Sequence, residues 1–152
     1  MDDVDRALVD ALRANARATY AQLAKVARLS PPAVHERVAK LEAAGVITGY
    51  HAAVSPESLG YAMGALIGVL ATDQAGAGSL AEALAAVSEI EDCWFVAGEE
   101  SYVVKVRVSD VGELEQLIGA INRIDGVART RTTVILSTKF EGRVKPLAKL
   151  PE

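Results

Sequence analysis

The chain has 152 residues, of which 51% are hydrophobic and 24% are charged, and these values exclude a disordered chain, a collagen-like fibre and a low-complexity protein. Its single cysteine, Cys93, excludes a disulfide framework within the chain and a cysteine-rich zinc site. The longest uncharged run, residues 58–72, is shorter than the roughly 20 residues that span a bilayer, and the acidic N-terminal residues contain no apolar signal core, so we expect a cytoplasmic protein without a membrane segment.

The first helix is predicted over residues 3–14. Asp2 and Asp5 stand at the spacing of an N-cap and the third helical residue, which is the arrangement of a capping box. The helix should end at residues 15–17, where Asn15 can adopt a left-handed conformation.

A second and a third helix are predicted before residue 45. Thr19 can cap a short helix that ends near Ala27. Ser30 is a favourable N-cap and Pro31 suits the first helical position, so a third helix should begin there and stop at Gly45. Apolar residues at helical spacing mark the inner faces of the three helices: Leu8, Leu12, Leu23, Ala24, Val34, Val38 and Leu41.

The second and third helices are separated by a turn of about three residues, at 27–29, which makes a helix-turn-helix pattern. The third helix would enter the major groove of DNA, which is wide enough for a helix. Its outward positions predict base-edge contacts from Pro32, His35, Glu36 and Ala39, phosphate contacts from Arg28, Arg37 and Lys40, and a further contact from Ser30 at its start. A plain three-helix bundle with a solvated charged face is the alternative.

The distribution of charge favours nucleic-acid binding, although the net charge of the chain is −4. Residues 1–53 carry seven basic and six acidic groups, residues 54–126 carry three and twelve, and residues 127–152 carry six and two. Within the first block, residues 17–40 hold five basic side chains and one acidic side chain, Glu36. A cationic segment beside an acidic centre is typical of a DNA-binding module joined to a unit with another role.

Residues 46–54 are predicted to form one or two short strands, and Ser55 with Pro56 breaks them. This break is the best candidate for a boundary between two domains. The predicted organisation is a helix-turn-helix unit with short strands over residues 1–54, a second domain over residues 55–138 and a basic tail over residues 139–152.

The second domain has the predicted order strand, helix, strand, strand, helix, strand, which is the ferredoxin-like arrangement of an α+β fold. The strands are expected at 63–71, 93–97, 102–108 and 127–138, with capping boxes at 79–82 and 110–113 opening the helices. Two helices cannot cover both faces of such a sheet, so one face should need a partner, and we expect a homo-oligomer.

Several short motifs from the two halves of the chain occur together in one order. Those in the first half are Asp5-Arg6, Arg17, Leu23-Ala24, Leu29-Ser30-Pro31, Arg37-Val38, Leu41-Glu42 and Gly45 to Tyr50. Those in the second half are Gly60, Gly98 to Val104, Asp125-Gly126-Val127 and Thr130-Arg131-Thr132. With them, nearly the whole chain except the tail resembles the Lrp/AsnC family of transcription regulators.

The resemblance implies a winged helix-turn-helix that binds double-stranded DNA and a ferredoxin-like domain that binds a small effector, commonly an amino acid, at an interface between dimers. An even-numbered homo-oligomer follows from it. The chain departs from the family at Ala16 and Arg28, where glycine is usual, and at Ser101, where an acidic residue is frequent.

The turn after the second strand of the ferredoxin-like unit is where the resemblance places the effector. Glu99 or Glu100 can accept bonds from an ammonium group, and the backbone N–H groups of Gly98 and Ser101 can donate to a carboxylate. Further predicted contacts are Tyr102, Thr132 and Ser137. An ordinary tight hairpin with solvated acids is the alternative.

Two other classes of function compete with a DNA-binding regulator. One is an amino-acid-sensing ferredoxin-like assembly module that does not bind DNA, although such a module has no need of the cationic segment. The other is a small enzyme, which is disfavoured because residues 54–152 contain no histidine. His35 and His51 have no ligand partners at suitable spacing, and Cys93 is expected in a buried strand, so neither a metal nor a cofactor is predicted.

Overall fold

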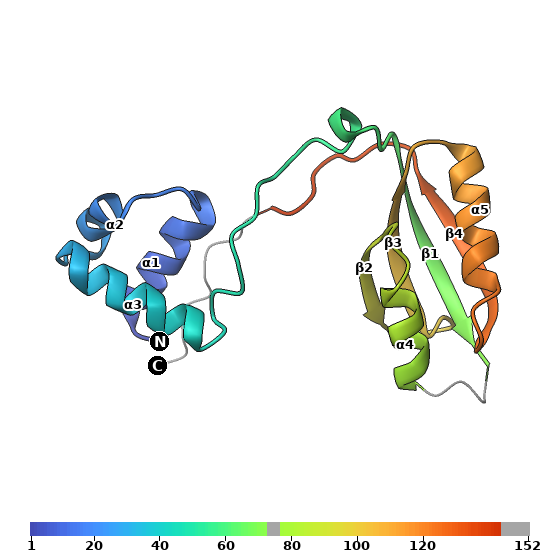
Figure 1. Ribbon diagram of the computed structural model, residues 1–152, viewed down its shortest axis with the longest axis horizontal. Coiled ribbons are helices and arrows are strands. Elements are labelled where there is room, and N and C mark those ends of the chain that lie inside the picture. The colour runs from blue at the N-terminus through green and yellow to red at the C-terminus, as the bar shows by residue number, and fades with distance from the viewer. Residues whose placement is uncertain (73–76, 144–152) are drawn as a thin grey trace. The chain divides into compact units, whose positions relative to one another are not determined.

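The computed structural model describes residues 1–72 and 77–143. They form two compact units, one of residues Met1–Ala53 together with residues 140–143, the other of residues Val54–Lys139 (Figure 1). Within the described residues, no helix has the length and apolar character that a membrane crossing requires.

Three helices make up the first unit: α1 (Asp3–Ala14), α2 (Tyr20–Ala27) and α3 (Pro31–Ala43). The predicted caps are confirmed. Asp5 N–H donates to the Asp2 carboxylate at 2.8 Å, and Asp2 N–H donates back to the Asp5 carboxylate at 3.1 Å. Thr19 caps α2 in the same reciprocal way, with Gln22 as its partner. All seven of the apolar residues predicted to face inward are buried.

The turn between α2 and α3 contains a strained residue. Arg28 caps the C-terminal end of α2 with φ 55° and ψ 43°, the left-handed conformation that favours glycine. The left-handed conformation predicted for Asn15 is wrong, since its φ is −148°. Its side chain instead accepts a bond from Arg17 N–H at 3.0 Å, which turns the chain without positive φ.

The short strands predicted at residues 46–54 do not form in the described structure. Val46 and Ile47 donate their backbone N–H groups to the Leu41 carbonyl, so the chain leaves α3 through a helix-end turn rather than entering a sheet. Beyond this turn the segment is irregular, and Tyr50 is about half exposed (46%). A strand needs a hydrogen-bonded neighbour, and the sequence pattern alone did not reveal that none is supplied here.

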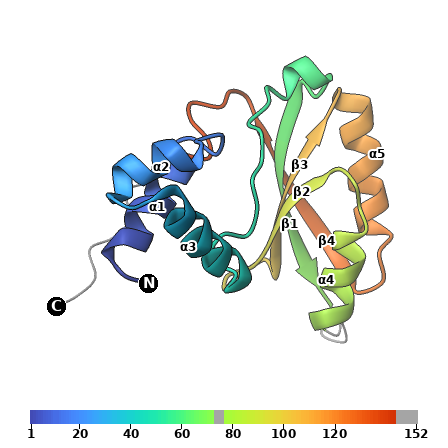
Figure 2. The same ribbon diagram turned by 60° about the vertical axis from the view of Figure 1, so that its left-hand side comes forward.

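The second unit has the predicted ferredoxin-like topology, and the α+β fold is confirmed. Its four antiparallel strands stand in the order β2-β3-β1-β4, and both helices pack on one face of the sheet (Figure 2). The elements are η1 (Glu57–Leu59), β1 (Met63–Ala71), α4 (Ala77–Ala85), β2 (Ile90–Phe95), β3 (Tyr102–Val108), α5 (Val111–Asn122) and β4 (Val127–Ile135).

The core of this unit lies between the sheet and its two helices. Alternate residues of β3 are buried as predicted, and they pack with residues from β1, α4 and α5. The core residues are Ala65, Ile67, Val69, Leu80, Leu84, Tyr102, Val104, Val106, Val108, Leu114, Leu117 and Ile121.

The intervening residues of the same strands point to the other side of the sheet, which neither α4 nor α5 covers. We call this side the helix-free face. Strand pairing assigns to it Gly64, Leu66, Gly68, Leu70, Asp92, Trp94, Val103, Lys105, Arg107, Arg129, Arg131, Thr133 and Ile135.

Several details of the second unit differ from the predictions. Strand β2 covers Ile90–Phe95 rather than 93–97, and β4 ends at Ile135 rather than at 138. Asp110 accepts the Glu113 N–H as predicted, but the Glu113 carboxylate accepts the Ser109 N–H, so the box is not reciprocal. Helix α4 begins at Ala77, so Ser79 lies inside the helix and does not open a capping box. Cys93 is exposed rather than buried, because β2 is an edge strand of the sheet.

Replacing Arg28 by glycine tests the strain in the α2–α3 turn. We expect Arg28→Gly to raise the free energy of unfolding by about 0.5–1 kcal/mol. Glycine removes the steric penalty of the left-handed conformation, and the greater conformational entropy of glycine in the unfolded chain offsets part of this gain. Arg17→Gly removes the same charge at a residue without positive φ and should be destabilising. The measurement is urea unfolding followed by helical circular dichroism; equal effects of the two substitutions would contradict the assignment.

Candidate functional site

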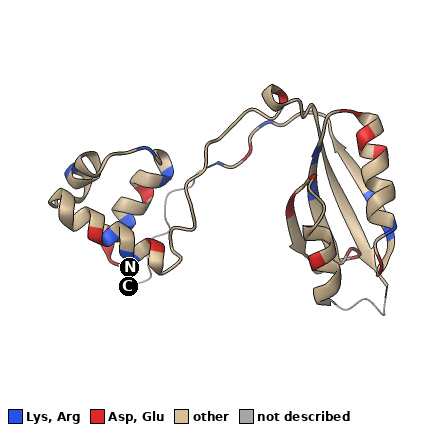
Figure 3. Ribbon diagram, in the orientation of Figure 1, with Lys and Arg blue, Asp and Glu red and all other residues tan. Residues whose placement is uncertain are grey.

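The outward face of α3 presents the residues predicted to read DNA. Pro32, His35, Glu36, Ala39 and Lys40 are all exposed, while Val34 and Val38 hold the opposite side of the helix in the core. Figure 3 marks basic positions on all three helices of this unit and acidic positions on α1 and α3. The helix therefore combines a fixed inner side with an open polar side, which is the geometry that groove insertion requires.

Two contacts organise the exposed side chains of α3. The His35 ring meets the Tyr20 ring of α2 edge-on, with centroids 5.1 Å apart, so α2 limits where the imidazole can point. Lys40 donates to Glu36 at 2.7 Å. This pair is largely exposed at both ends, so it contributes little to stability and can open when another anion approaches Lys40.

Arg37 is placed differently from the other predicted phosphate contacts. Its guanidinium donates to Asp2 and to Asp5, each at 2.7 Å, and so ties α3 to the start of α1. The Asp5 backbone N–H and the Arg37 guanidinium hold the pKa of Asp2 below its usual range. This arrangement favours Arg37 as a residue that positions α3 rather than one that reaches for a phosphate.

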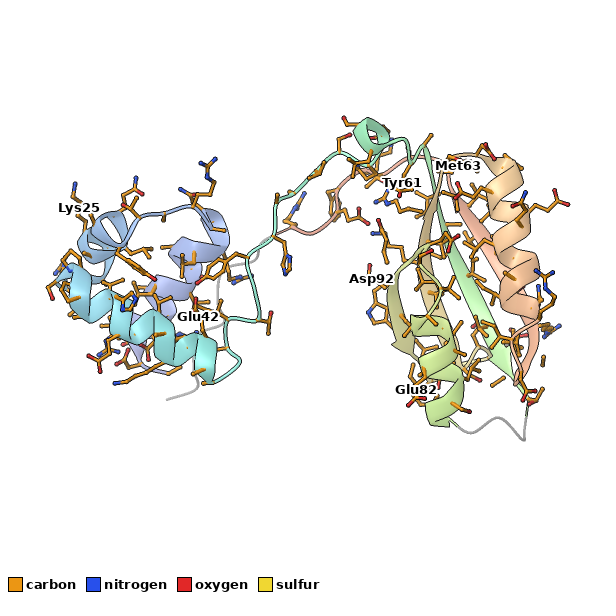
Figure 4. All side chains as sticks on the ribbon, in the orientation of Figure 1. Lys25, Glu42, Tyr61, Met63, Glu82 and Asp92 are labelled. Carbon is orange, nitrogen blue, oxygen red and sulfur yellow. The ribbon has the colours of Figure 1, made fainter. Side chains whose placement is uncertain are left out.

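Other groups near α3 complete the surface. Arg28 is exposed at the end of α2, and the Ser30 hydroxyl accepts the Ala33 N–H at 3.4 Å, capping α3. Lys25 was not among the predicted contacts, although the cationic segment contains it; it projects outward from α2 (Figure 4). Tyr50 donates its hydroxyl to Glu42 at 2.7 Å, and burial followed by this bond raises the pKa of Tyr50 to about 12.

The predicted effector turn is held by a network of four charges on the helix-free face. Arg131 donates to Glu99 at 2.8 Å and to Glu100 at 3.0 Å, and Arg129 donates to Glu99 at 3.1 Å. We call these four residues the charge network. The Arg131 guanidinium keeps the pKa of Glu99 below its usual range. Neither arginine was predicted as a site residue, because only the pairing of β4 with β1 brings them to the turn.

The Glu100 side chain lies next to Gly68 of β1. A Cβ atom added at Gly68 would stand 2.6 Å from the Glu100 Cγ, so only glycine leaves room for this side chain. The Glu100 side chain is 22% exposed, whereas that of Glu99 is 54% exposed. The two acids of the turn are therefore held with unequal freedom.

The structure does not gather all of the predicted effector contacts. The Ser101 N–H donates to the Val69 carbonyl at 2.9 Å, so the Ser101 N–H is not available to a ligand carboxylate. The Ser101 hydroxyl accepts a bond from the Ala71 N–H. Tyr102 is buried in the core and packs against Phe95.

Thr132 and Ser137 are also separated from the turn. Thr132 pairs with Ile67 and so faces the helix-covered side of the sheet. Ser137 follows the end of β4 that lies beside Gly64, whereas the turn lies at the Ala71 end of β1. Within one chain, therefore, Thr132 is separated from the turn because it faces the covered side of the sheet, and Ser137 because β4 ends at the far end of β1.

No group of three potential metal ligands occurs among residues 1–72 and 77–143.

Comparison with known proteins identifies both parts of the chain. Residues 1–42 match the AsnC-type helix-turn-helix domain, and residues 65–144 match the Lrp/AsnC ligand binding domain. The chain is 42% identical to the HTH-type transcriptional regulator LrpA of Mycobacterium tuberculosis, over 94% of this chain and 95% of that protein. It is 35% identical to the regulatory protein AsnC of Escherichia coli, over 96% and 97%.

Solved structures agree with this relationship. The crystal structure of M. tuberculosis LrpA has a TM-score of 0.88 at 40% identity, covering 97% of this chain and all (100%) of that one. A feast or famine regulatory protein from M. tuberculosis, in complex with L-methionine, has a TM-score of 0.90 at 41% identity, covering 96% and 99%. The structure of E. coli AsnC has a TM-score of 0.83 at 35% identity, with the same coverage.

The ion pairs of Arg37 generate a prediction about pH. Because the pKa of Asp2 is lowered in the folded protein, its pair with Arg37 stabilises the fold above the ordinary value of 3.8 and is lost as the pH falls through the folded pKa. Arg37→Ala should lower the free energy of unfolding at neutral pH, and the difference from wild type should shrink on acidification. Arg13→Ala, which breaks a pair within α1, is the control and should have a smaller effect. A pH-independent loss in Arg37→Ala would contradict this role.

Proposed function

The chain belongs to the Lrp/AsnC family of DNA-binding transcription regulators, and from this membership we propose which of its surfaces bind DNA, a second copy and an effector. The observation that carries the proposal is the exposed outer side of α3, backed by a fully packed inner side. The sequence of the first 42 residues supports the same assignment.

For DNA, we propose that Pro32, His35, Glu36 and Ala39 face base edges and that Lys40 contacts phosphate. Arg28 and Ser30 stand at the turn that leads into α3, where they can contact the sugar–phosphate backbone. Arg37 holds the angle of α3 through its two ion pairs. In this scheme the residues that face base edges determine which operator is bound, and the residues that contact the phosphate backbone determine the affinity for any duplex.

For assembly, we propose that copies of the chain associate through the helix-free face into a dimer or a larger even-numbered oligomer. Two observations support this. The face carries Leu66, which is 37% exposed and lies between Gly64 and Gly68 on the same side of β1. Neither α4 nor α5 covers this face. A single helix-turn-helix also makes too few contacts for tight binding, so pairs of units are needed.

For the effector, we propose a small amino acid bound beside the charge network. A related protein from M. tuberculosis binds L-methionine, and the matching residues 65–144 of this chain contain the network. A zwitterion offers one positive and one negative group, and the network supplies partners for both.

DNA binding is tested with wild type and two variants of α3. If a dimer neutralises about 6 phosphates, the log–log plot of affinity against salt should have a slope near −5. Lys40→Ala should weaken binding to all duplexes alike, while His35→Ala should change which genomic fragments are preferred. Arg123→Ala, on the second unit, is the control. A flat salt dependence would favour a sensing module without DNA binding.

A further inference from the structure

One of the two backbone donors expected for the carboxylate of an amino acid is already in use, because the Ser101 N–H is bonded to the Val69 carbonyl. A carboxylate brought to this turn has the Gly98 N–H as its remaining expected backbone donor. A cation beside the turn would supply the second partner. Arg131 is the candidate, because its guanidinium bonds both acids of the turn, whereas Arg129 bonds Glu99, and the Arg131 side chain is 55% exposed.

The two acids bonded to Arg131 differ in how easily they can be displaced. The Glu100 side chain occupies the space beside Gly68 that a Cβ atom would fill, and it is only 22% exposed, so it is fixed by packing as well as by charge. Glu99 has no such support, and its contacts in the network are the charge-paired bonds to Arg129 and Arg131. Exposed pairs of this kind contribute little free energy, so an incoming anion can replace Glu99 at small cost.

We propose that Arg131 is the specificity-determining residue that binds the effector carboxylate, with Glu99 exchanged for that carboxylate and Glu100 retained. This rests on the proposed function, since it assumes that the effector binds beside this turn. The released Glu99 carboxylate then accepts a hydrogen bond from the ammonium group of the ligand and keeps its bond to Arg129. Every charge of the network and of the zwitterion has a partner after the exchange, which is the condition for charged groups to leave water without a large penalty.

The exchange defines the chemical class of the effector. A free α-amino acid satisfies both halves of the site. An amino acid amide has the ammonium group but no carboxylate for Arg131, so Arg131 stays on Glu99 and nothing accommodates the ligand's amide end. A carboxylic acid without an amino group can displace Glu99 from Arg131, but it offers no ammonium group for the displaced Glu99 to bind.

The test is calorimetric titration of L-methionine, and of the other standard amino acids in parallel, into the full chain. We expect Arg131→Gln to weaken the binding of L-methionine, or of the amino acid that wild type binds best, by at least about tenfold, because a charged hydrogen bond is lost. Arg131→Lys should retain part of the affinity. Arg123→Gln, which removes the same charge from the end of α5, is the matched control and should bind as wild type does. The amide of the same amino acid should not bind wild type.

A second variant separates ligand recognition from a purely structural role of Arg131. Glu99→Gln removes the acid that competes for Arg131, so it should bind the deaminated analogue of the amino acid more tightly than wild type does, while the amino acid itself loses affinity. If Arg131 only held the turn in shape, Glu99→Gln would weaken both ligands alike.

The outcomes distinguish this inference from the proposed function. If wild type binds an amino acid and Arg131→Gln binds it equally, or if the amide binds as well as the acid, Arg131 does not receive the carboxylate and only this inference falls. If wild type binds none of the amino acids, the effector part of the proposed function falls, and this inference falls with it.

Discussion

The constraint on which the second unit depends is that two helices bury one side of a four-stranded sheet and leave the other side uncovered. Ile67, Val69, Val104 and Val106 point toward the helices and form a core. The alternation of strand residues then fixes Gly68, Arg129 and Arg131 on the opposite side. The charge network, the exposed leucine and the proposed interface between copies all follow from this one separation of the sheet into a filled side and an open side.

The first unit depends in a similar way on what holds α3. Its inner side is buried among apolar residues of α1 and α2, and Arg37 fixes its edge to Asp2 and Asp5. The outward side chains of α3 have weaker contacts: His35 meets the Tyr20 ring, and Lys40 forms an exposed pair with Glu36. A helix held this firmly can present His35 and Lys40 to DNA without losing the order of its core.

Capping residues and hydrophobic periodicity predicted most of the helices and strands. The contacts within the two candidate sites could not be predicted in this way, because they join segments that are far apart in the sequence. Caps at Asp2 and Ser30 and the alternation in β3 located their elements correctly, because the signal and the structure it predicts lie within a few residues. The contacts of Arg131 and Arg37 were missed because each joins residues more than 30 positions apart. The strands predicted at 46–54 were wrong for the same reason: a strand requires a partner, and periodicity within one segment does not supply it.

We propose that assembly through the helix-free face brings two α3 helices to DNA together. The most direct test is Leu66→Glu, which places a charge on that face, studied by sedimentation and by affinity for genomic fragments that wild type retains. We expect the variant to dissociate and to lose most of its DNA affinity, while Val26→Glu, at an exposed residue of α2, stays assembled. If Leu66→Glu remains assembled, or dissociates and still binds DNA as tightly as wild type, the helix-free face is not the interface that DNA binding requires.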